Sequence, residues 1–250
     1  MEFADKVVIV TGGGQGMGEK IAMTFAKEGA SVALLDLNLD TAKAVADQIK
    51  ADGGKSLAIK TDVGKKAEVD AAIKQVLDTF GTVDILVNNA GFVYAKPSKF
   101  WQEDEEYWNK VIDCCYKGVM FCCNAVLPTM MEKKSGKIVS IASDAAKVGQ
   151  SGQTVYSGAK GAVVAFSKGL AKEVARYGIN INCVSPGATR TPAFAQMTPE
   201  MQSKISDSYL FKRVAEPEDI ANAVVFLASS KSCYMTGQNL SVSSGYTMIG

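Results

Sequence analysis

Residues 6–36, KVVIVTGGGQGMGEKIAMTFAKEGASVALLD, decide the fold of this chain. They begin with an apolar, β-branched run at Lys6–Thr11, which is typical of a strand buried on both faces of a parallel sheet. A glycine-rich turn follows and leads into a predicted helix, EKIAMTFAKEG, and then into a second strand at Ser31–Leu35. Glycines allow the backbone to approach a ligand closely, and the free N–H groups at the start of the helix attract an anion.

An acidic residue, Asp36, closes the second strand about twenty residues after the glycines. In a dinucleotide-binding unit, an acid at this position receives the adenosine ribose hydroxyls of NAD. A carboxylate there would repel the 2′-phosphate of NADP, and positions 15, 37 and 38 hold no arginine that would bind such a phosphate. The sequence therefore predicts NAD rather than NADP as the cofactor.

Strands and helices continue to alternate up to the C-terminus. Further strands are predicted at 56–60, 84–87, 137–142, 179–184 and near 239–242. Helices are predicted at 40–51, 65–80, about 104–134 and 217–229, and another helix is predicted to follow Tyr156. About seven strands in this order predict an α/β fold, a Rossmann-type doubly wound parallel sheet flanked by helices. No linker or repeat interrupts the pattern, so residues 1–250 are predicted to form a single domain.

Composition and charge exclude several classes of protein. With 47% hydrophobic and 21% charged residues the chain has an ordinary globular composition. The net charge is +1 and the basic residues are scattered, which argues against nucleic acid or an anionic membrane as the main partner. The N-terminus starts with acids and enters a strand at once, and no apolar run approaches the ~20 residues of a membrane span, so we expect a cytoplasmic protein without a signal peptide.

The chain contains no histidine. Ser-His-Asp and Cys-His catalysis and histidine metal ligands are therefore closed to it. None of the six cysteines has C-x-x-C spacing, so we expect small buried hydrophobic residues in a reducing cytosol and no metal site. Any proton transfer must then fall to Tyr, Lys, Asp, Glu or Cys.

The predicted catalytic segment is Ser143–Lys160, SDAAKVGQSGQTVYSGAK. Tyr156 and Lys160 stand at i and i+4 of a predicted helix, so both side chains share one face. A free phenol has a pKa of about 10, and a nearby ammonium favours the phenolate and lowers that value. A tyrosine tuned in this way can exchange a proton with an alcohol or a carbonyl, and Ser143, at the end of a strand, can hold the same oxygen.

Together these motifs make the chain resemble the short-chain dehydrogenase/reductase family over essentially all 250 residues. The matching motifs are the glycine turn Thr11-Gly12-x-x-x-Gly16-x-Gly18, the fourth-strand motif Asn88-Asn89-Ala90-Gly91, the serine and Tyr-x-x-x-Lys of Ser143, Tyr156 and Lys160, and Pro186-Gly187 with Thr191. The resemblance implies an NAD-dependent oxidoreductase that interconverts a secondary alcohol and the ketone by hydride transfer.

The resemblance also implies a role for each matching residue. Tyr156 is the general acid/base, Ser143 positions the substrate oxygen, and Lys160 binds the nicotinamide ribose and tunes Tyr156. Cofactor contacts are implied for Gly12, Gln15, Gly16, Met17 and Gly18 at the pyrophosphate, Asp36 at the adenosine ribose, Asp62 and Val63 at the adenine with Asn89 nearby, and Thr189 and Thr191 at the carboxamide.

One position departs from the family pattern. The central helix of the family usually carries an asparagine that anchors a water linking the lysine to solvent, and Cys115 stands in its place here. A thiol is a weak hydrogen-bond partner and does not replace a carboxamide. The alternative function is therefore an NAD-binding, catalytically weak scaffold or regulatory subunit, although Ser143, Tyr156 and Lys160 are all present.

Three segments are expected to form the substrate wall: Phe92–Trp101, Asp144–Thr154 and Arg190–Pro217. The last of these, at about 190–217, is either a lid over the cleft or a core helix. The run SDAAKVGQSGQTVY is similar to ring-hydroxyacyl-CoA dehydrogenases and 3-oxoacyl reductases, so the substrate is expected to be a hydroxyacyl-CoA or a cyclic alcohol. Basic residues in or beside these segments are either surface charges or contacts for such an anion: Lys96, Lys99, Lys147, Arg190, Lys204, Lys212 and Arg213.

An oligomer is also expected. The helix 156–175 carries a surface of small residues that allows close packing on a partner: Ser157, Gly158, Ala159, Gly161, Ala162 and Ala165. The family resemblance implies pairing across two-fold axes into a homotetramer, and closed symmetric assemblies are the usual form of oligomer.

Overall fold

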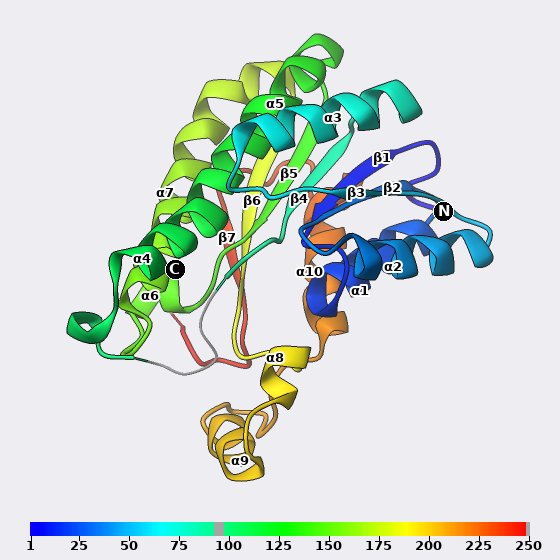
Figure 1. Cartoon of the computed structure of the whole chain (residues 1–250). Coiled ribbons are helices and arrows are strands. Elements are labelled where there is room, and N and C mark those ends of the chain that lie inside the picture. Colours follow the sequence, from blue (N-terminus) through cyan, green and yellow to red (C-terminus); the bar gives the residue numbers. More distant parts are fainter. Residues whose placement is uncertain (93–97, 249–250) are drawn as a thin grey trace.

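Seven parallel strands form one twisted sheet at the centre of the molecule (Figure 1). The computed structural model of the chain describes residues 1–92 and 98–248. The strand order is β3-β2-β1-β4-β5-β6-β7, so the direction of winding reverses between β1 and β4. The strands are β1 (Val7–Thr11), β2 (Ser31–Asp36), β3 (Lys55–Lys60), β4 (Ile85–Asn88), β5 (Gly136–Ile141), β6 (Ile179–Pro186) and β7 (Asn239–Val242). The predicted α/β sheet and its strand count are confirmed.

Helices cover both faces of the sheet (Figure 1). One face packs on α1 (Gly16–Lys27), α2 (Leu39–Ala51) and α10 (Pro217–Ala228), and the other on α3 (Lys66–Phe80), α5 (Gly118–Lys133) and α7 (Thr154–Val174). The alternation of side chains explains the two layers: Val8 and Val10 of β1 point into the first, whereas Val7 and Ile9 point into the second. Because both faces are covered, the strands are continuously apolar.

The predicted helix at about 104–134 contains a break in its hydrogen-bond pattern. It consists of α4 (Glu105–Ile112), a π turn η2 at Asp113–Lys117, and α5. Because the π turn joins the two helices without a gap, Glu105–Lys133 is a continuous helical stretch of 29 residues, and its most apolar part has a mean hydropathy of 1.3. By length and composition alone it could cross a membrane, which the sequence did not lead us to expect. Its side chains Val119, Cys122, Val126 and Met130 lie in the core under the sheet, and a core helix of this kind has the same composition.

The segment that follows β6 does not form one core helix. It contains α8 (Pro192–Ala195) and α9 (Pro199–Asp207), which lie beyond the carboxyl end of β6 and away from the sheet (Figure 1). No residue of α9 is buried. A small separate cluster of Phe194, Tyr209 and Val214 holds the segment together. Of the two alternatives for this segment, the core helix is wrong.

Several short elements complete the chain. They are α6 (Ala145–Val148) and the 3₁₀ turns η1 (Phe100–Gln102), η3 (Ala175–Tyr177) and η4 (Ser230–Ser232). Four of the six cysteines are buried, Cys114 is half-buried and Cys233 is exposed, so the prediction of buried hydrophobic thiols is confirmed for four of them. Residues 93–97 of the predicted substrate wall, which include Lys96, lie outside the described residues.

Candidate active site

The glycine turn after β1 has a backbone that neighbouring groups can approach closely. Gly12 has a φ of +62°, in the left-handed region that favours glycine. A Cβ added at Gly18 would collide with the carbonyl oxygen of Gly12, so the first turn of α1 packs directly on the loop. Asn89 holds this loop: its Nδ2 donates to the carbonyl oxygens of Thr11 at 2.9 Å and Gly12 at 3.0 Å, while its buried Oδ1 has no partner in the described chain.

Asp36 lies at the same turn, as the sequence predicted from its place after β2. Its Oδ2 accepts the N–H of Gly14 at 2.9 Å and its Oδ1 accepts the N–H of Asn38 at 2.9 Å. Two backbone donors fix the orientation of the carboxylate, and the side chain of Asn38 is already used as the N-cap of α2. A fixed anion beside a glycine loop suits the diol of a ribose.

The other predicted cofactor residues surround this loop. Gln15 is exposed and caps α1, Met17 packs on the first helix layer, and a Cβ at Gly16 would lie 3.5 Å from the side chains of Thr191 and Pro192. The chain after β6 therefore crosses back to the glycine turn. Thr191 caps α8 and accepts the N–H of Phe194 at 3.4 Å.

Asp62 and Val63 lie just past the carboxyl end of β3, and Thr189 lies past that of β6. Thr189 is buried, and its hydroxyl donates to the Gly187 carbonyl at 3.2 Å. Asp62 accepts the N–H of Gly64 at 3.0 Å, and Val63 is buried beneath it. Parallel strands end at one edge of the sheet, so these residues, the glycine turn and Asp36 all lie along that edge.

The predicted catalytic residues come from β5 and α7. The hydroxyl of Ser143, just past β5, accepts the N–H of Ala145 at 3.1 Å, which leaves its proton free to donate. Lys160 is only 2% exposed, and its Nζ donates to the carbonyl of Ile141 at 2.7 Å and lies 5.8 Å from the centre of the Tyr156 ring. One helical face thus carries Tyr156 and Lys160 against the end of β5.

The pKa of Tyr156 differs in direction from the expectation. Burial raises the pKa of this phenol, and the charge of Lys160 and a hydrogen bond from Ser143 lower it without cancelling the effect of burial. Burial is the largest single effect on the pKa of Lys160 and lowers it, but Cys115, Tyr156, Cys114 and Cys183 together raise it by more, so the net pKa of this ammonium is above its usual value. Lys160 lowers the pKa of Tyr156 as expected, but the net pKa of Tyr156 is nevertheless above that of a free tyrosine.

Three hydrogen bonds at the site were missed in the sequence. Ser185 lies within hydrogen-bonding distance of the Ser143 carbonyl, at 3.2 Å, and of Oδ1 of Asn239, at 2.8 Å, so β6 and β7 together hold the predicted catalytic serine. The hydroxyl of Tyr209 accepts the N–H of Ala188 at 2.5 Å. All three join residues far apart in the chain, so no local sequence pattern could have indicated them.

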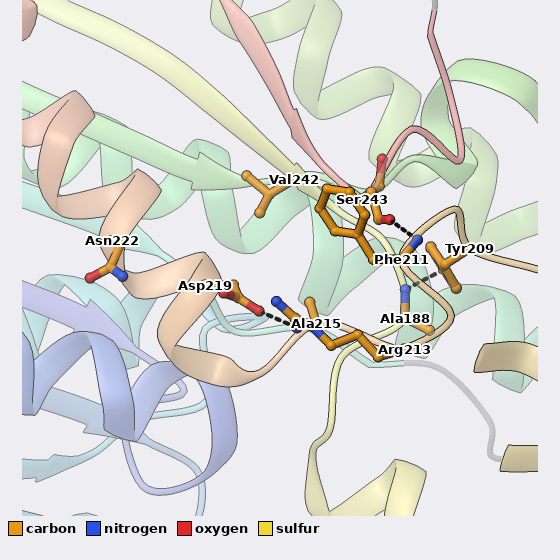
Figure 2. Close-up of a pocket in the computed structure, with 10 residues that line it drawn as sticks. Ala188, Tyr209, Phe211, Arg213, Ala215, Asp219, Asn222, Val242 and Ser243 are labelled. Atoms are coloured by element: carbon orange, nitrogen blue, oxygen red, sulfur yellow. Dashed lines mark hydrogen bonds and ion pairs between the residues drawn. The ribbon is translucent and has the colours of Figure 1, made fainter. Parts of the chain in front are cut away.

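Tyr209 lines a hollow of about 220 Å³ behind the loop that follows β6 (Figure 2). Phe211 and Ser243 lie on one side of it, and Arg213 pairs with Asp219 at 2.7 Å on another. Ser244 binds the segment to the C-terminal turn by accepting the N–H of Phe211 at 2.8 Å. The predicted lid is therefore attached at its C-terminal end to α10 and to the turn that follows β7.

Comparison with known proteins agrees with this geometry. The family model described as enoyl-(acyl carrier protein) reductase matches residues 12–247. The chain is 39% identical to the (2S)-[(R)-hydroxy(phenyl)methyl]succinyl-CoA dehydrogenase subunit BbsD of Thauera aromatica over 99% of each chain. It is 38% identical to the 3-oxoacyl-[acyl-carrier-protein] reductase FabG of Staphylococcus epidermidis over 98% of this chain and 100% of the other.

A solved structure is similar throughout. The 3-ketoacyl-(acyl-carrier-protein) reductase from Brucella melitensis, crystallised as a complex with NADH, superimposes with a TM-score of 0.93 at 34% identity, over 98% of this chain and 100% of that one. The fold, the order of the motifs and these full-length likenesses agree, and the chain belongs to the short-chain dehydrogenase/reductase family of oxidoreductases.

Proposed function

We propose that this protein is an NAD-dependent dehydrogenase that interconverts a secondary alcohol and the corresponding ketone. The observation that carries the proposal is the convergence of Ser143, Tyr156 and the buried Lys160 at the end of β5, beside a glycine turn with a fixed carboxylate. The bound cofactor supplies the hydride chemistry, and the protein supplies position and electrostatics.

Each catalytic side chain has a separate task. The Ser143 hydroxyl accepts one hydrogen bond, from the Ala145 N–H, and donates its proton toward the reacting oxygen. Tyr156 takes the proton from an alcohol or gives it to a carbonyl. Lys160 is held by the Ile141 carbonyl, so its positive charge stays at a fixed place and favours the phenolate. Burial of the group keeps water away from this charge and strengthens its effect.

The choice of NAD rests on Asp36. Its two backbone hydrogen bonds hold a negative charge where a 2′-phosphate would stand in NADP. The next residue, Leu37, is exposed and apolar and offers no cation in compensation. The similar Brucella melitensis reductase was crystallised with NADH. With NAD as the cofactor, oxidation of the alcohol is the proposed working direction.

The proposed substrate class is a hydroxyacyl-CoA, with cyclic alcohols as the simpler alternative. The support is the 39% identity to a dehydrogenase subunit named for a succinyl-CoA substrate. Four of the basic residues considered for anion binding are already engaged. Arg190 pairs with Glu216 at 2.9 Å and Arg213 with Asp219 at 2.7 Å, while Lys212 and Lys147 donate to the carbonyls of Asp207 at 2.8 Å and Asn239 at 3.4 Å. Lys99 and Lys204 remain exposed in the predicted substrate segments.

The proposal is tested with a panel of hydroxyacyl thioesters, cyclic alcohols and hydroxysteroids, with NADH absorbance as the readout. We expect turnover with at least one member and a loss of about a hundredfold or more in Tyr156→Phe, because a positioned general base contributes 10²–10⁴-fold. NAD binding by calorimetry serves as the control and should survive in this variant. Binding of NAD without turnover across the whole panel would favour the catalytically weak scaffold instead.

We also propose a cytoplasmic homotetramer. The small residues Gly158, Ala162 and Ala165 lie along the outer side of α7, and a Cβ added at Gly158 would meet nothing within 4 Å. A smooth helix face of this kind allows a second helix to approach closely. Sedimentation at micromolar protein concentration tests the assembly, and a monomer would contradict it.

A further inference from the structure

Asp144, the residue after the predicted catalytic Ser143, carries a buried carboxylate. The residue is only 2% exposed, and none of the ion pairs formed by the described residues includes it. A charged group that is removed from water costs free energy unless hydrogen bonds compensate the loss. The contacts of this carboxylate therefore indicate what it is used for.

The carboxylate of Asp144 does not cap the helix that it precedes. Aspartate at the N-cap of a helix usually accepts an N–H of the first turn. Asp144 is the N-cap of α6 without such a bond, and the hydroxyl of Ser143 accepts the N–H of Ala145 instead. The Asp144 Oδ1 accepts the hydroxyl of Ser241 in β7 at 2.8 Å, while the buried Oδ2 has no partner in the described chain. The side chain therefore serves a contact with β7 rather than the helix.

The backbone of Asp144 is fixed on both sides. Its N–H donates to the carbonyl of Pro186 in β6 at 3.1 Å. Its carbonyl accepts the N–H groups of Lys147 at 2.9 Å and Val148 at 3.3 Å. Because the side chain and both peptide groups of Asp144 are held, the adjoining Ser143 has little freedom to move. Of these hydrogen bonds, the one from Ser241 is the one that a substitution of the Asp144 side chain removes.

A second side-chain bridge reaches Ser143 from the same strand. Asn239 and Ser241 lie at i and i+2 of β7, so their side chains share one face of the sheet. Ser185 of β6 is the register partner of Ser241, and its hydroxyl lies 2.8 Å from Oδ1 of Asn239 and 3.2 Å from the Ser143 carbonyl. The edge strand β7 thus supports Ser143 in two ways: at its carbonyl through Ser185, and at the next residue through Asp144.

We propose that Asp144 is a positioning residue of this active site, whose hydrogen bond with Ser241 holds Ser143 in place. Ser143 then presents its hydroxyl where it donates to the reacting oxygen. A hydrogen bond to a carboxylate is shorter and stronger than a neutral one, which suits a contact that must resist movement. The effect on catalysis rests on the dehydrogenase function proposed above, because that function gives Ser143 its task. The anchoring of the Ser143 segment to β7 does not depend on that function.

The anchoring is tested by amide hydrogen exchange of peptides that cover residues 143–148, measured by mass spectrometry without substrate. Ser241→Ala removes the donor and leaves the sequence of these peptides unchanged. Exchange should become about tenfold faster or more, because hydrogen bonds to charged groups are among the stronger ones in proteins.

Ser243→Ala is the matched control for the exchange experiment. Ser243 lies two residues further along the chain and is buried, and its hydroxyl has no partner in the described chain. Its removal should leave the exchange of residues 143–148 at the wild-type rate. Unchanged exchange in Ser241→Ala, or an equal increase in both variants, overturns the anchoring.

The effect on catalysis is tested with an alcohol that the wild type oxidises. Asp144→Ala and Ser241→Ala should each lower kcat about tenfold to a hundredfold, since a small displacement of a catalytic group has effects of this size. The double variant should lose no more than the more impaired single variant, because both changes break one hydrogen bond. Asp144→Asn keeps an acceptor for Ser241 and should restore most of the rate. The NAD affinity of all these variants in calorimetry should stay near the wild-type value.

The Ser143→Ala background separates positioning from a general structural role. Without the Ser143 hydroxyl, Asp144→Ala should have no further effect on single-turnover NADH formation, because the group that it positions is absent. An equal fold-loss with and without this hydroxyl overturns the proposal. If Asp144→Ala does not fold, Ser241→Ala takes its place in the same comparison. A wild type that oxidises no alcohol would count against the proposed function alone, and the hydrogen-exchange result would still decide the anchoring.

Discussion

Replacing Gly18 by alanine should damage both stability and cofactor binding. The added Cβ would collide with the carbonyl oxygen of Gly12 and would lie 2.5 Å from Nδ2 of Asn89 and 2.8 Å from the carbonyl carbon of Gly12. The neighbouring atoms are backbone and a side-chain amide that holds the loop through two hydrogen bonds, so neither can move without loss. The start of α1 must then shift away from the glycine turn.

The size of the effect follows from two opposing contributions. Insertion of a methyl group into a packed site costs about 1–3 kcal/mol. Alanine is intrinsically up to ~1 kcal/mol better than glycine inside a helix, which offsets part of that cost. The net loss is therefore about 1–2 kcal/mol, and for a chain of this length each kcal/mol corresponds to about 2–4 °C in Tm. NAD affinity should fall at least about tenfold, equivalent to ~1.4 kcal/mol, because the displaced turn carries the N–H donors.

Thermal denaturation and calorimetric titration with NAD measure the two effects. Gly169→Ala is the matched control, since a Cβ at this exposed position of α7 meets nothing within 4 Å in the chain. It should keep the wild-type NAD affinity, whereas its stability also depends on the proposed contact of α7 with a partner helix, because Gly169 lies on the same side of α7 as Gly158. An unchanged Tm and an unchanged NAD affinity in Gly18→Ala would refute the reasoning about the turn.

Three further predictions concern the cofactor, the backbone and the pH profile. Asp36→Ser should weaken NAD binding about tenfold to a hundredfold, because a hydrogen bond to a charged group is worth ~1.5–3 kcal/mol. The same variant should use NADP better relative to NAD. An unchanged preference between NAD and NADP in steady-state assays would contradict this. Lys134 has a φ of +52°, so Lys134→Gly should raise stability by up to ~1 kcal/mol in thermal melts, whereas Ser244→Gly, at a φ of +49°, should not gain because it loses the bond to Phe211. Because Lys160 lowers the pKa of Tyr156, Lys160→Met should move the acid limb of the pH profile for alcohol oxidation to higher pH. The rate of NADH formation as a function of pH measures this shift. An acid limb that stays in place would contradict the role of Lys160.

Features that depend on local sequence could be predicted from the chain alone. The strand at Lys6–Thr11, the glycine turn and Asp36 lie within 31 consecutive residues, and β-branched residues, glycines and an acid each have a strong local preference there. The i, i+4 spacing likewise placed Tyr156 and Lys160 on one face of α7. Their roles in catalysis stay predictions until variants are measured.

The π turn at Asp113–Lys117 was not predictable in the same way. The same apolar residues would be compatible with an uninterrupted α-helix, and one additional residue in a single turn leaves no mark in the periodicity of the side chains. The contacts of Ser185 with Ser143 and Asn239 were hidden for a different reason. They join three strand ends that become neighbours only when the sheet has assembled.

The pKa of Tyr156 shows why the Tyr-x-x-x-Lys spacing alone does not define a base. The spacing brings an ammonium near the phenol and lowers its pKa, but the same packing that holds Lys160 also buries the phenol, and burial acts in the opposite sense and by more. A tyrosine is activated only where the cations and donors around it exceed the cost of burial. In this chain one such donor, Ser143, comes from the segment that follows β5. The pKa of Tyr156 therefore depends on the assembled sheet as well as on the motif, and a substitution of Ser143 should raise it without touching Tyr156 or Lys160.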